Sequence, residues 1–149
     1  MQDTASSVHS ATETTVPLKM LLVEDSAVLA ARLEELLTHV PGVDLASTVD
    51  TEAEAVAAIT DGGIDVVILD LHLRQGTGFG VLRGIANLQR RPVIIVLTNY
   101  ALEQYLRSAS SFGVDHFLDK ARDFDSLPDL LQRIAGSGGI GGGLTPGRR

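Results

Sequence analysis

Four apolar runs, spread over most of the chain, each end in a polar or charged side chain. Glu24 and Asp25 follow the first run, Asp70 the second, Thr98 the third and Lys120 the fourth. Strand-like runs that alternate with helix-like segments favour βαβ crossovers and a parallel sheet, whose strands all have their carboxyl ends at one edge. We therefore expect these side chains to meet in one crevice, although they are far apart in the sequence.

The charges of this crevice indicate its chemistry. Three carboxylates and one ammonium sum to minus two, and like charges about 4 Å apart repel by roughly 4 kcal/mol at an effective dielectric of about 20. A hard cation such as Mg²⁺ would relieve this repulsion, because it prefers oxygen ligands and keeps waters that a phosphate can replace.

With Lys120 and Thr98 available to bind phosphoryl oxygens, the crevice suits phosphoryl transfer. Asp70 is the natural acceptor, because carboxylates form aspartyl phosphates. The alternative, in which each acid only caps a helix or solvates a strand end, is reasonable for one residue but not for four groups together.

Five segments are expected to form strands. Three of them are almost continuously apolar, as strands buried on both faces must be: residues 18–23, 64–69 and 93–98. The other two, residues 43–49 and 114–118, are interrupted by Asp44 and His116. We expect the first three to be central and the last two to be edge strands.

Five helices are predicted between and after the strands. Ser26 is the expected N-cap of the first, and Thr51 with Glu54 forms the capping box of the second. The third is expected from about Gly78 to Leu88 and is weakened by internal glycines.

Apolar spacing predicts the last two helices. Leu102, Leu106 and Ala109 mark the fourth. The fifth has Ser126 as its expected N-cap and Pro128 in its first turn, and its markers are Phe124, Leu127, Leu131 and Ile134.

Four short motifs stand at the strand ends: Leu22-Val23-Glu24-Asp25, Ile68-Leu69-Asp70-Leu71-His72-Leu73 with Gly78, Val96-Leu97-Thr98-Asn99, and Asp115-His116-Phe117-Leu118-Asp119-Lys120. Together, over roughly residues 18 to 135, they resemble the receiver domain of two-component response regulators. The resemblance implies an α/β fold of flavodoxin-like type: a doubly wound five-stranded parallel sheet of strand order 2-1-3-4-5 with helices on both faces. It also implies a phosphoryl group taken from a histidine kinase or a phosphotransfer protein.

The resemblance assigns the acceptor and the metal ligands. Asp70 resembles the phosphoacceptor, and Asp25 and Asp70 resemble direct Mg²⁺ ligands. Glu24 resembles an outer or water-mediated ligand, and the backbone carbonyl of His72 resembles the third protein ligand. The His72 ring itself is interpreted as a solvated side chain.

The resemblance also assigns the phosphate contacts and a switch. Thr98 and Lys120 resemble the pair that binds phosphoryl oxygens, and Phe117 resembles the aromatic switch that changes rotamer as Thr98 moves toward the phosphate. The alternative for Phe117 is an ordinary core aromatic. His72 and Tyr100 occupy the positions that flank the phosphate and tune its lifetime in the family.

Two departures from the family pattern concern the loops around the site. Family members usually have proline after the lysine and four residues after the acceptor, where this chain has Ala121 and Arg74. A cis peptide bond after Lys120 therefore cannot be assumed. The acid pair begins with Glu24 where Asp is commoner, which lengthens one arm of the site and keeps its charge.

Composition narrows the function classes. The chain has no cysteine, which excludes disulfides, a thiolate nucleophile and a zinc-thiolate site. Lys and Arg total 12 against 19 for Asp and Glu, so direct nucleic-acid binding is not expected. No signal peptide and no apolar run near the roughly 20 residues of a membrane helix are found, so we expect a cytoplasmic protein without membrane insertion.

The expected organisation is a single receiver domain with two extensions. Residues 1–16 are predicted to be a disordered N-terminal extension, residues 17–135 the receiver domain, and residues 136–149 a flexible glycine-rich tail. We expect a monomer or a weak dimer.

Three functions remain for comparison. The favoured one is a stand-alone phosphorylatable receiver that lacks an output domain and binds a kinase, a phosphotransfer protein or a target protein as its fourth helix and fifth strand rearrange. It is expected to be no enzyme beyond assisting its own phosphorylation and dephosphorylation. It could also be the N-terminal receiver of a longer transcriptional regulator. The second is a receiver-like interaction module that never takes phosphate. The third, an aspartyl-phosphate hydrolase, needs a second Asp two residues after Asp70, where this chain has His72.

Overall fold

Five strands pair in parallel in one sheet, in the order β2-β1-β3-β4-β5. The computed structural model describes residues 16–99 and 102–137. The strands are β1 (Leu18–Val23), β2 (Val43–Val49), β3 (Val66–Leu69), β4 (Val93–Thr98) and β5 (His116–Asp119). The predicted fold class, with the interrupted strands at the edges, is confirmed.

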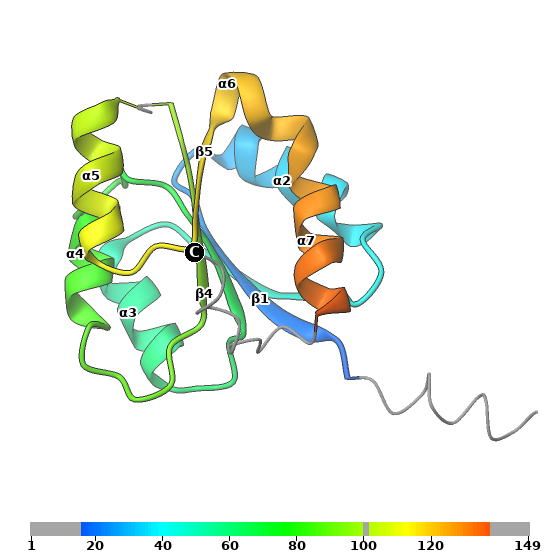
Figure 1. Cartoon of the computed structure of the whole chain (residues 1–149), viewed down its shortest axis with the longest axis horizontal. Helices are drawn as coiled ribbons and strands as arrows, with labels where there is room; N and C mark the ends of the chain where they lie inside the picture. Colours follow the sequence, from blue (N-terminus) through cyan, green and yellow to red (C-terminus); the bar gives the residue numbers. More distant parts are fainter. Residues whose placement is uncertain (1–15, 100–101, 138–149) are drawn as a thin grey trace, which may run out of the picture.

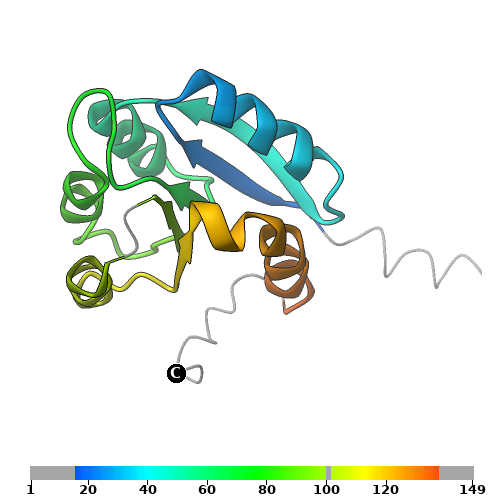
Figure 2. The same cartoon turned by 90° about the horizontal axis from the view of Figure 1, so that it is seen from above.

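Helices cover both faces of the sheet. They are α2 (Ala27–Thr38), α3 (Glu52–Thr60), α4 (Gly78–Gly84), α5 (Glu103–Ser111), α6 (Lys120–Asp123) and α7 (Leu127–Gly136), with a 3-10 turn, η1 (Phe124–Ser126), between the last two. Helices α3, α4 and α5 lie on one side of the sheet and α2 and α7 on the other (Figure 1). The view from above shows the same three layers (Figure 2).

The central strands bury side chains on both faces, which gives the molecule two apolar clusters. One cluster joins Leu22 and Ile68 of the sheet to Leu33 of α2 and Leu131 of α7. The other joins the opposite face of the same strands to α3 and α4, and includes Leu82. This two-sided burial explains why the three central segments are almost continuously apolar in sequence.

The first two helices begin as predicted. The Leu29 N–H donates to Ser26 Oγ at 3.2 Å, and the Glu54 N–H donates to Thr51 Oγ1 at 3.2 Å. The return bond of the expected capping box is displaced by one residue, because Glu54 Oε1 accepts from the Asp50 N–H at 3.4 Å. None of the described helices is long and apolar enough to cross a membrane.

Two predicted element ends are corrected. Strand β3 begins at Val66 rather than at residue 64, and just before it the Asp65 side chain accepts the Lys19 N–H at 2.8 Å. Helix α4 ends at Gly84 rather than near Leu88, in keeping with the low helix propensity of glycine.

The predicted N-cap of the last helix is wrong in its chemistry. Ser126 has helical dihedral angles and makes no side-chain cap, and its hydroxyl donates instead to the Asp123 carbonyl oxygen at 2.7 Å. Helix α6 and η1 run directly into α7, so the residue before α7 is already helical, whereas an N-cap residue needs non-helical dihedral angles.

The predicted fourth helix forms as α5, but its marker residues are not all buried. Of its three marker residues, Ala109 is buried, whereas Leu102 and Leu106 are 52% and 43% exposed. Leu106 of α5 and its N-cap residue Leu102 therefore present apolar side chains to solvent.

Candidate functional site

The carboxyl ends of four parallel strands place the predicted site residues at one edge of the sheet. Glu24 and Asp25 follow β1, and Asp70 follows its neighbour β3, where Val23 pairs with Leu69. Thr98 is the last residue of β4, and Lys120 directly follows β5. The parallel sheet is the reason that these distant positions share one crevice.

A lysine joins the two buried carboxylates of this crevice. Lys120 Nζ lies 2.8 Å from Asp70 Oδ2 and 3.0 Å from Glu24 Oε1. The side chains are 8%, 6% and 2% exposed for Lys120, Asp70 and Glu24. Buried charges of this kind need partners, and one ammonium here serves two carboxylates.

The third acid completes an oxygen-only cluster. One carboxylate oxygen from each of Glu24, Asp25 and Asp70 lies within 4.8 Å of the others, and Asp25 is the exposed member. Lys120 offsets one of the three negative charges, so the cluster retains the net charge of minus two expected from sequence.

Burial and pairing shift two pKa values in the site. Burial raises the pKa of Glu24 and outweighs the lowering effect of its bond to Lys120. For Lys120, burial lowers the pKa, but hydrogen bonds and charge attraction from Asp70 and Glu24 outweigh it and raise the pKa overall. Lys120 is therefore cationic at neutral pH.

The main chain around Asp70 is fixed on both sides. The Asp70 N–H donates to the Val23 carbonyl at 3.1 Å, and the His72 N–H donates to Asp70 Oδ1 at 3.3 Å. Gly78 lies so close to this turn that a Cβ there would overlap the Asp70 carbonyl oxygen. The glycine of the motif is thus required by packing.

Thr98 and Phe117 lie on the same face of neighbouring strands. Thr98 is fully buried and stands opposite Asp119, while Phe117 stands opposite Val96. Phe117 is partly buried and packs against the apolar cluster on the α3 and α4 side. Because alternate residues of a strand share a face, Thr98 and Phe117 are diagonal neighbours.

The two positions predicted to tune phosphate lifetime have different outcomes. His72 is exposed, and its ring meets that of Tyr105 on α5 edge-on, with centroids 6.3 Å apart. Tyr100 lies outside the described residues. Sequence reasoning missed Tyr105, because only the packing of α5 against this loop brings the two rings together.

The chain after Lys120 differs from a proline-containing loop. All described peptide bonds are trans, including that between Lys120 and Ala121. Asp119 caps α6 by accepting the N–H groups of Ala121 at 2.8 Å and Arg122 at 3.2 Å, and Asp123 Oδ2 accepts the Asp119 N–H at 2.9 Å. These bonds hold Lys120 at the first position of a helix.

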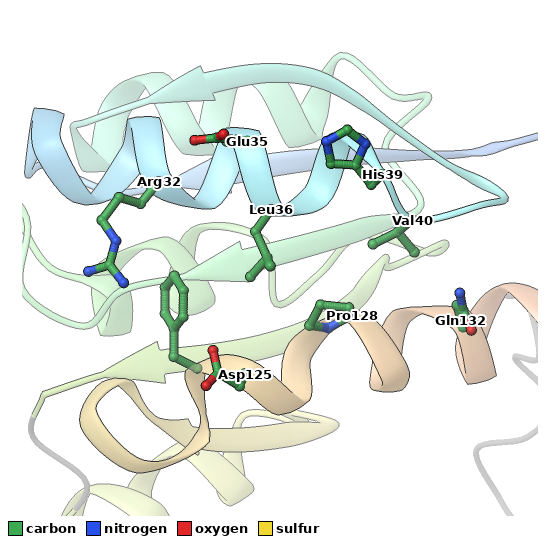
Figure 3. Close-up of a pocket in the computed structure, with 9 residues that line it drawn as sticks. Arg32, Glu35, Leu36, His39, Val40, Asp125, Pro128 and Gln132 are labelled. Carbon is green, nitrogen blue, oxygen red and sulfur yellow. The ribbon is translucent and has the colours of Figure 1, made fainter.

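A cavity of about 550 Å³ lies between α2 and α7, away from this cluster. Leu36, Val40 and Pro128 line its middle, and Arg32 and Asp125 lie at one end (Figure 3). None of the predicted site residues lines this cavity.

Comparison with known proteins defines the class to which this fold and site belong. The model of the response regulator receiver domain matches residues 20–132. The chain belongs to the response regulator receiver domain family. A curated relative, protein-glutamate methylesterase/protein-glutamine glutaminase 2 of Koribacter versatilis, is 30% identical over 124 residues, which are 81% of this chain and 33% of that protein.

Solved structures share the fold. The Mn²⁺-bound form of response regulator Rcp1 is 26% identical, with a TM-score of 0.64 over 79% of this chain and 91% of that one. The CheX–CheY complex with BeF₃ and Mg²⁺ from Borrelia burgdorferi is 23% identical, with a TM-score of 0.72 over 83% of this chain and 92% of that one.

The curated relatives are longer than the part that they share with this chain. The chain spans 48%, 33% and 57% of the length of three of them.

Proposed function

We propose that this chain is a phosphorylation-dependent receiver of a two-component system that accepts a phosphoryl group on Asp70. The observation that carries the proposal is the position of Lys120 Nζ, 2.8 Å from Asp70 Oδ2 and 3.0 Å from Glu24 Oε1, at a strand edge with three clustered carboxylates. The phosphodonor is a histidine kinase or a histidine phosphotransfer protein.

The donor set fits Mg²⁺. It offers only oxygen atoms, its carboxylates lie within 4.8 Å of one another, and its net negative charge is not fully offset by Lys120. Asp25, Asp70 and the main-chain carbonyl of His72 would hold the ion, with Glu24 acting through water. The bound ion would neutralise this charge and polarise the phosphoryl oxygens.

The chain's own residues perform the transfer. A carboxylate oxygen of Asp70 attacks phosphorus, the phosphorus–nitrogen bond of the donor phosphohistidine breaks, and its electron pair returns to the imidazole nitrogen of the donor. The Lys120 ammonium and the Thr98 hydroxyl donate hydrogen bonds to the phosphoryl oxygens as negative charge builds there. No enzymatic activity beyond this self-modification and its reversal is proposed.

The signal would leave the site through β5 and α5. When Thr98 moves toward the phosphoryl group, it vacates space into which the diagonal neighbour Phe117 turns. The surface formed by α5 and β5 then changes, and a downstream protein can recognise the change. The chain's net charge of −7 repels nucleic acid, so the target is a protein.

The boundaries of the functional unit are part of the proposal. We propose that residues 17–135 form the receiver domain, supported by the family match over residues 20–132 and by the end of α7 at Gly136. Occurrence within a longer regulator is supported by the greater length of the relatives.

Phosphorylation by a small donor tests the function. Wild-type protein, Asp70→Asn and the exposed control Asp61→Asn are incubated with acetyl phosphate and Mg²⁺, and their intact masses are measured. Wild type and the control should each gain one phosphoryl group and Asp70→Asn none. Equal labelling of all three would overturn Asp70 as the acceptor, and labelling of none would favour an interaction module that takes no phosphate.

A further inference from the structure

The loop that follows Asp70 is attached to the start of α3. The Glu52 N–H donates to the Gln75 carbonyl at 3.0 Å, and Thr51 and Gln75 form an isolated parallel bridge. The Thr77 N–H donates to Glu52 Oε1 at 3.0 Å. The loop, residues 71–77, thus has main-chain partners outside its own strand and helix.

Close packing accompanies these bonds. Gly76 has a φ of +86°, and a Cβ at Gly76 or at Gly80 would overlap the Glu52 side chain. The glycines let Glu52 reach the start of α4, where its carboxylate accepts the Thr77 N–H.

An ion pair restrains the middle of the same loop. Arg74 Nε and Nη2 donate to the two carboxylate oxygens of Asp50, each at 3.1 Å. The side chains are 55% and 41% exposed, so the bidentate geometry matters more than the charge attraction, which solvent weakens. Arginine leaves φ free where proline would fix it, and here the side-chain pair with Asp50 adds a restraint at position 74.

The restrained segment is continuous with the acceptor. His72 lies two residues before Arg74, its N–H donates to Asp70 Oδ1 at 3.3 Å, and its carbonyl belongs to the proposed Mg²⁺ ligand set. A displacement of this segment that includes His72 therefore moves a proposed ligand atom.

We propose that Arg74 and Asp50 are positioning residues that hold the acceptor loop in its ion-binding conformation before Mg²⁺ arrives. The inference rests on the proposed function for its consequence, Mg²⁺ binding, but its structural content is independent of phosphorylation. If the loop is already ordered, Mg²⁺ binding does not have to supply the free energy needed to order it, and the affinity is higher.

A purely electrostatic role for Arg74 and Asp50 would change the Mg²⁺ affinity of their variants in a different way from a positioning role. If the two residues acted only through their fields, Arg74→Gln would strengthen Mg²⁺ binding at the acidic cluster and Asp50→Asn would weaken it. If they act by positioning, both variants weaken binding, and the double variant is no worse than either single variant.

The first experiment measures loop order without metal. In EDTA, amide hydrogen exchange of Glu52 and Thr77, followed by NMR, should accelerate roughly two- to fivefold in Arg74→Gln and in Asp50→Asn, the range that one exposed ion pair sustains. Exchange of Asp70, whose N–H bonds to β1, should not change. Unchanged exchange at Glu52 and Thr77 would overturn the proposal.

The second experiment titrates MgCl₂ into the full chain by calorimetry. Both single variants should bind roughly two- to fivefold more weakly than wild type, with Arg74→Lys in between because it keeps the charge and loses the fork. Arg107→Gln, which removes an exposed ion pair with Glu103 on α5, should bind like wild type. Opposite shifts in the two single variants would assign a field effect and overturn positioning.

Failure of this inference and failure of the proposed function are distinguishable. If wild type is labelled on Asp70 while the Arg74 and Asp50 variants match it in exchange and Mg²⁺ affinity, the proposed function stands and the positioning role falls. If wild type takes no phosphoryl group but the variants accelerate exchange and lose Mg²⁺ affinity, the positioning role stands without it.

Discussion

At the scale of single residues, one lysine pairs with two buried carboxylates in the site. Lys120 contacts Asp70 and Glu24, and all three side chains are almost completely buried. Removing one partner of a buried ion pair leaves uncompensated charge, at a typical cost of about 3 to 5 kcal/mol. Lys120 therefore supports the stability of the ion-free protein as well as phosphoryl binding.

Replacing this lysine tests that dual role. Lys120→Met should lower the free energy of unfolding by about 3 kcal/mol in EDTA, measured by urea denaturation, and added Mg²⁺ should recover more stability than it gives wild type. Lys120→Arg keeps the charge and should lose less. Equal unfolding midpoints for Lys120→Met and wild type in EDTA would contradict the ion-pair assignment.

A second prediction at this scale concerns pH. The hydrogen bonds from Arg74 hold the pKa of Asp50 below its ordinary value. A lowered folded-state pKa gives stability that is present above the unfolded pKa and is lost as the pH falls through the folded value. In Arg74→Gln the Asp50 pKa should rise toward that of a free aspartate, followed by NMR of its carboxyl carbon. An unchanged titration curve would show that the pair does not form in solution.

At the scale of elements, α5 is a helix that few buried side chains hold in place. It buries Ala109 alone among its residues and leaves Leu106 43% exposed. The ring of its Tyr105 meets those of His72 and Phe79. Few buried contacts mean low local stability. The helix next to the proposed switch can therefore move at small cost.

Perturbation of this element by a phosphate mimic is the next prediction. Beryllofluoride with Mg²⁺ should shift backbone NMR signals of residues 99–120 more than those of residues 52–60 in α3. Phe117 has no hydroxyl to hold either rotamer, so we expect the two proposed states to differ by packing alone and the equilibrium between them to be shallow. Shifts confined to the neighbours of Asp70 would favour an interaction module that does not switch.

At the scale of the whole molecule, one sheet connects two apolar clusters. Leu33 of α2 and Leu82 of α4 are both fully buried, on opposite faces. The central strands belong to both clusters, because their side chains alternate between the faces. Neither cluster can be lost while the strands remain, so the protein should unfold in one cooperative step.

Truncation on each face tests this coupling. Leu33→Ala and Leu82→Ala should each lower the free energy of unfolding by about 3 kcal/mol. Far-UV circular dichroism and tyrosine fluorescence should report the same urea midpoint within each variant. Fluorescence midpoints that stay at the wild-type value in Leu33→Ala would mean that the faces unfold separately.

The sequence could predict those features of the fold and the site whose causes lie within a few neighbouring residues or in the general geometry of a parallel sheet. The central strands were predictable because burial on both faces demands continuous apolar runs, and the caps at Ser26 and Thr51 were predictable because their partners lie three residues away. The edge that gathers Asp70 and Lys120 was predictable because parallel strands share the direction of their carboxyl ends.

Tertiary structure decided the features whose partners are distant in sequence. Asp50 and Arg74 are 24 residues apart, and His72 meets Tyr105 only because α4 and α5 pack on the same face. Ser126 is a residue type that commonly caps helices, but it lacks the backbone geometry of an N-cap, because it is the last residue of η1, which connects α6 to α7. Periodicity and capping are short-range effects that the sequence by itself determined, whereas these contacts depend on how elements pack after the sheet has formed.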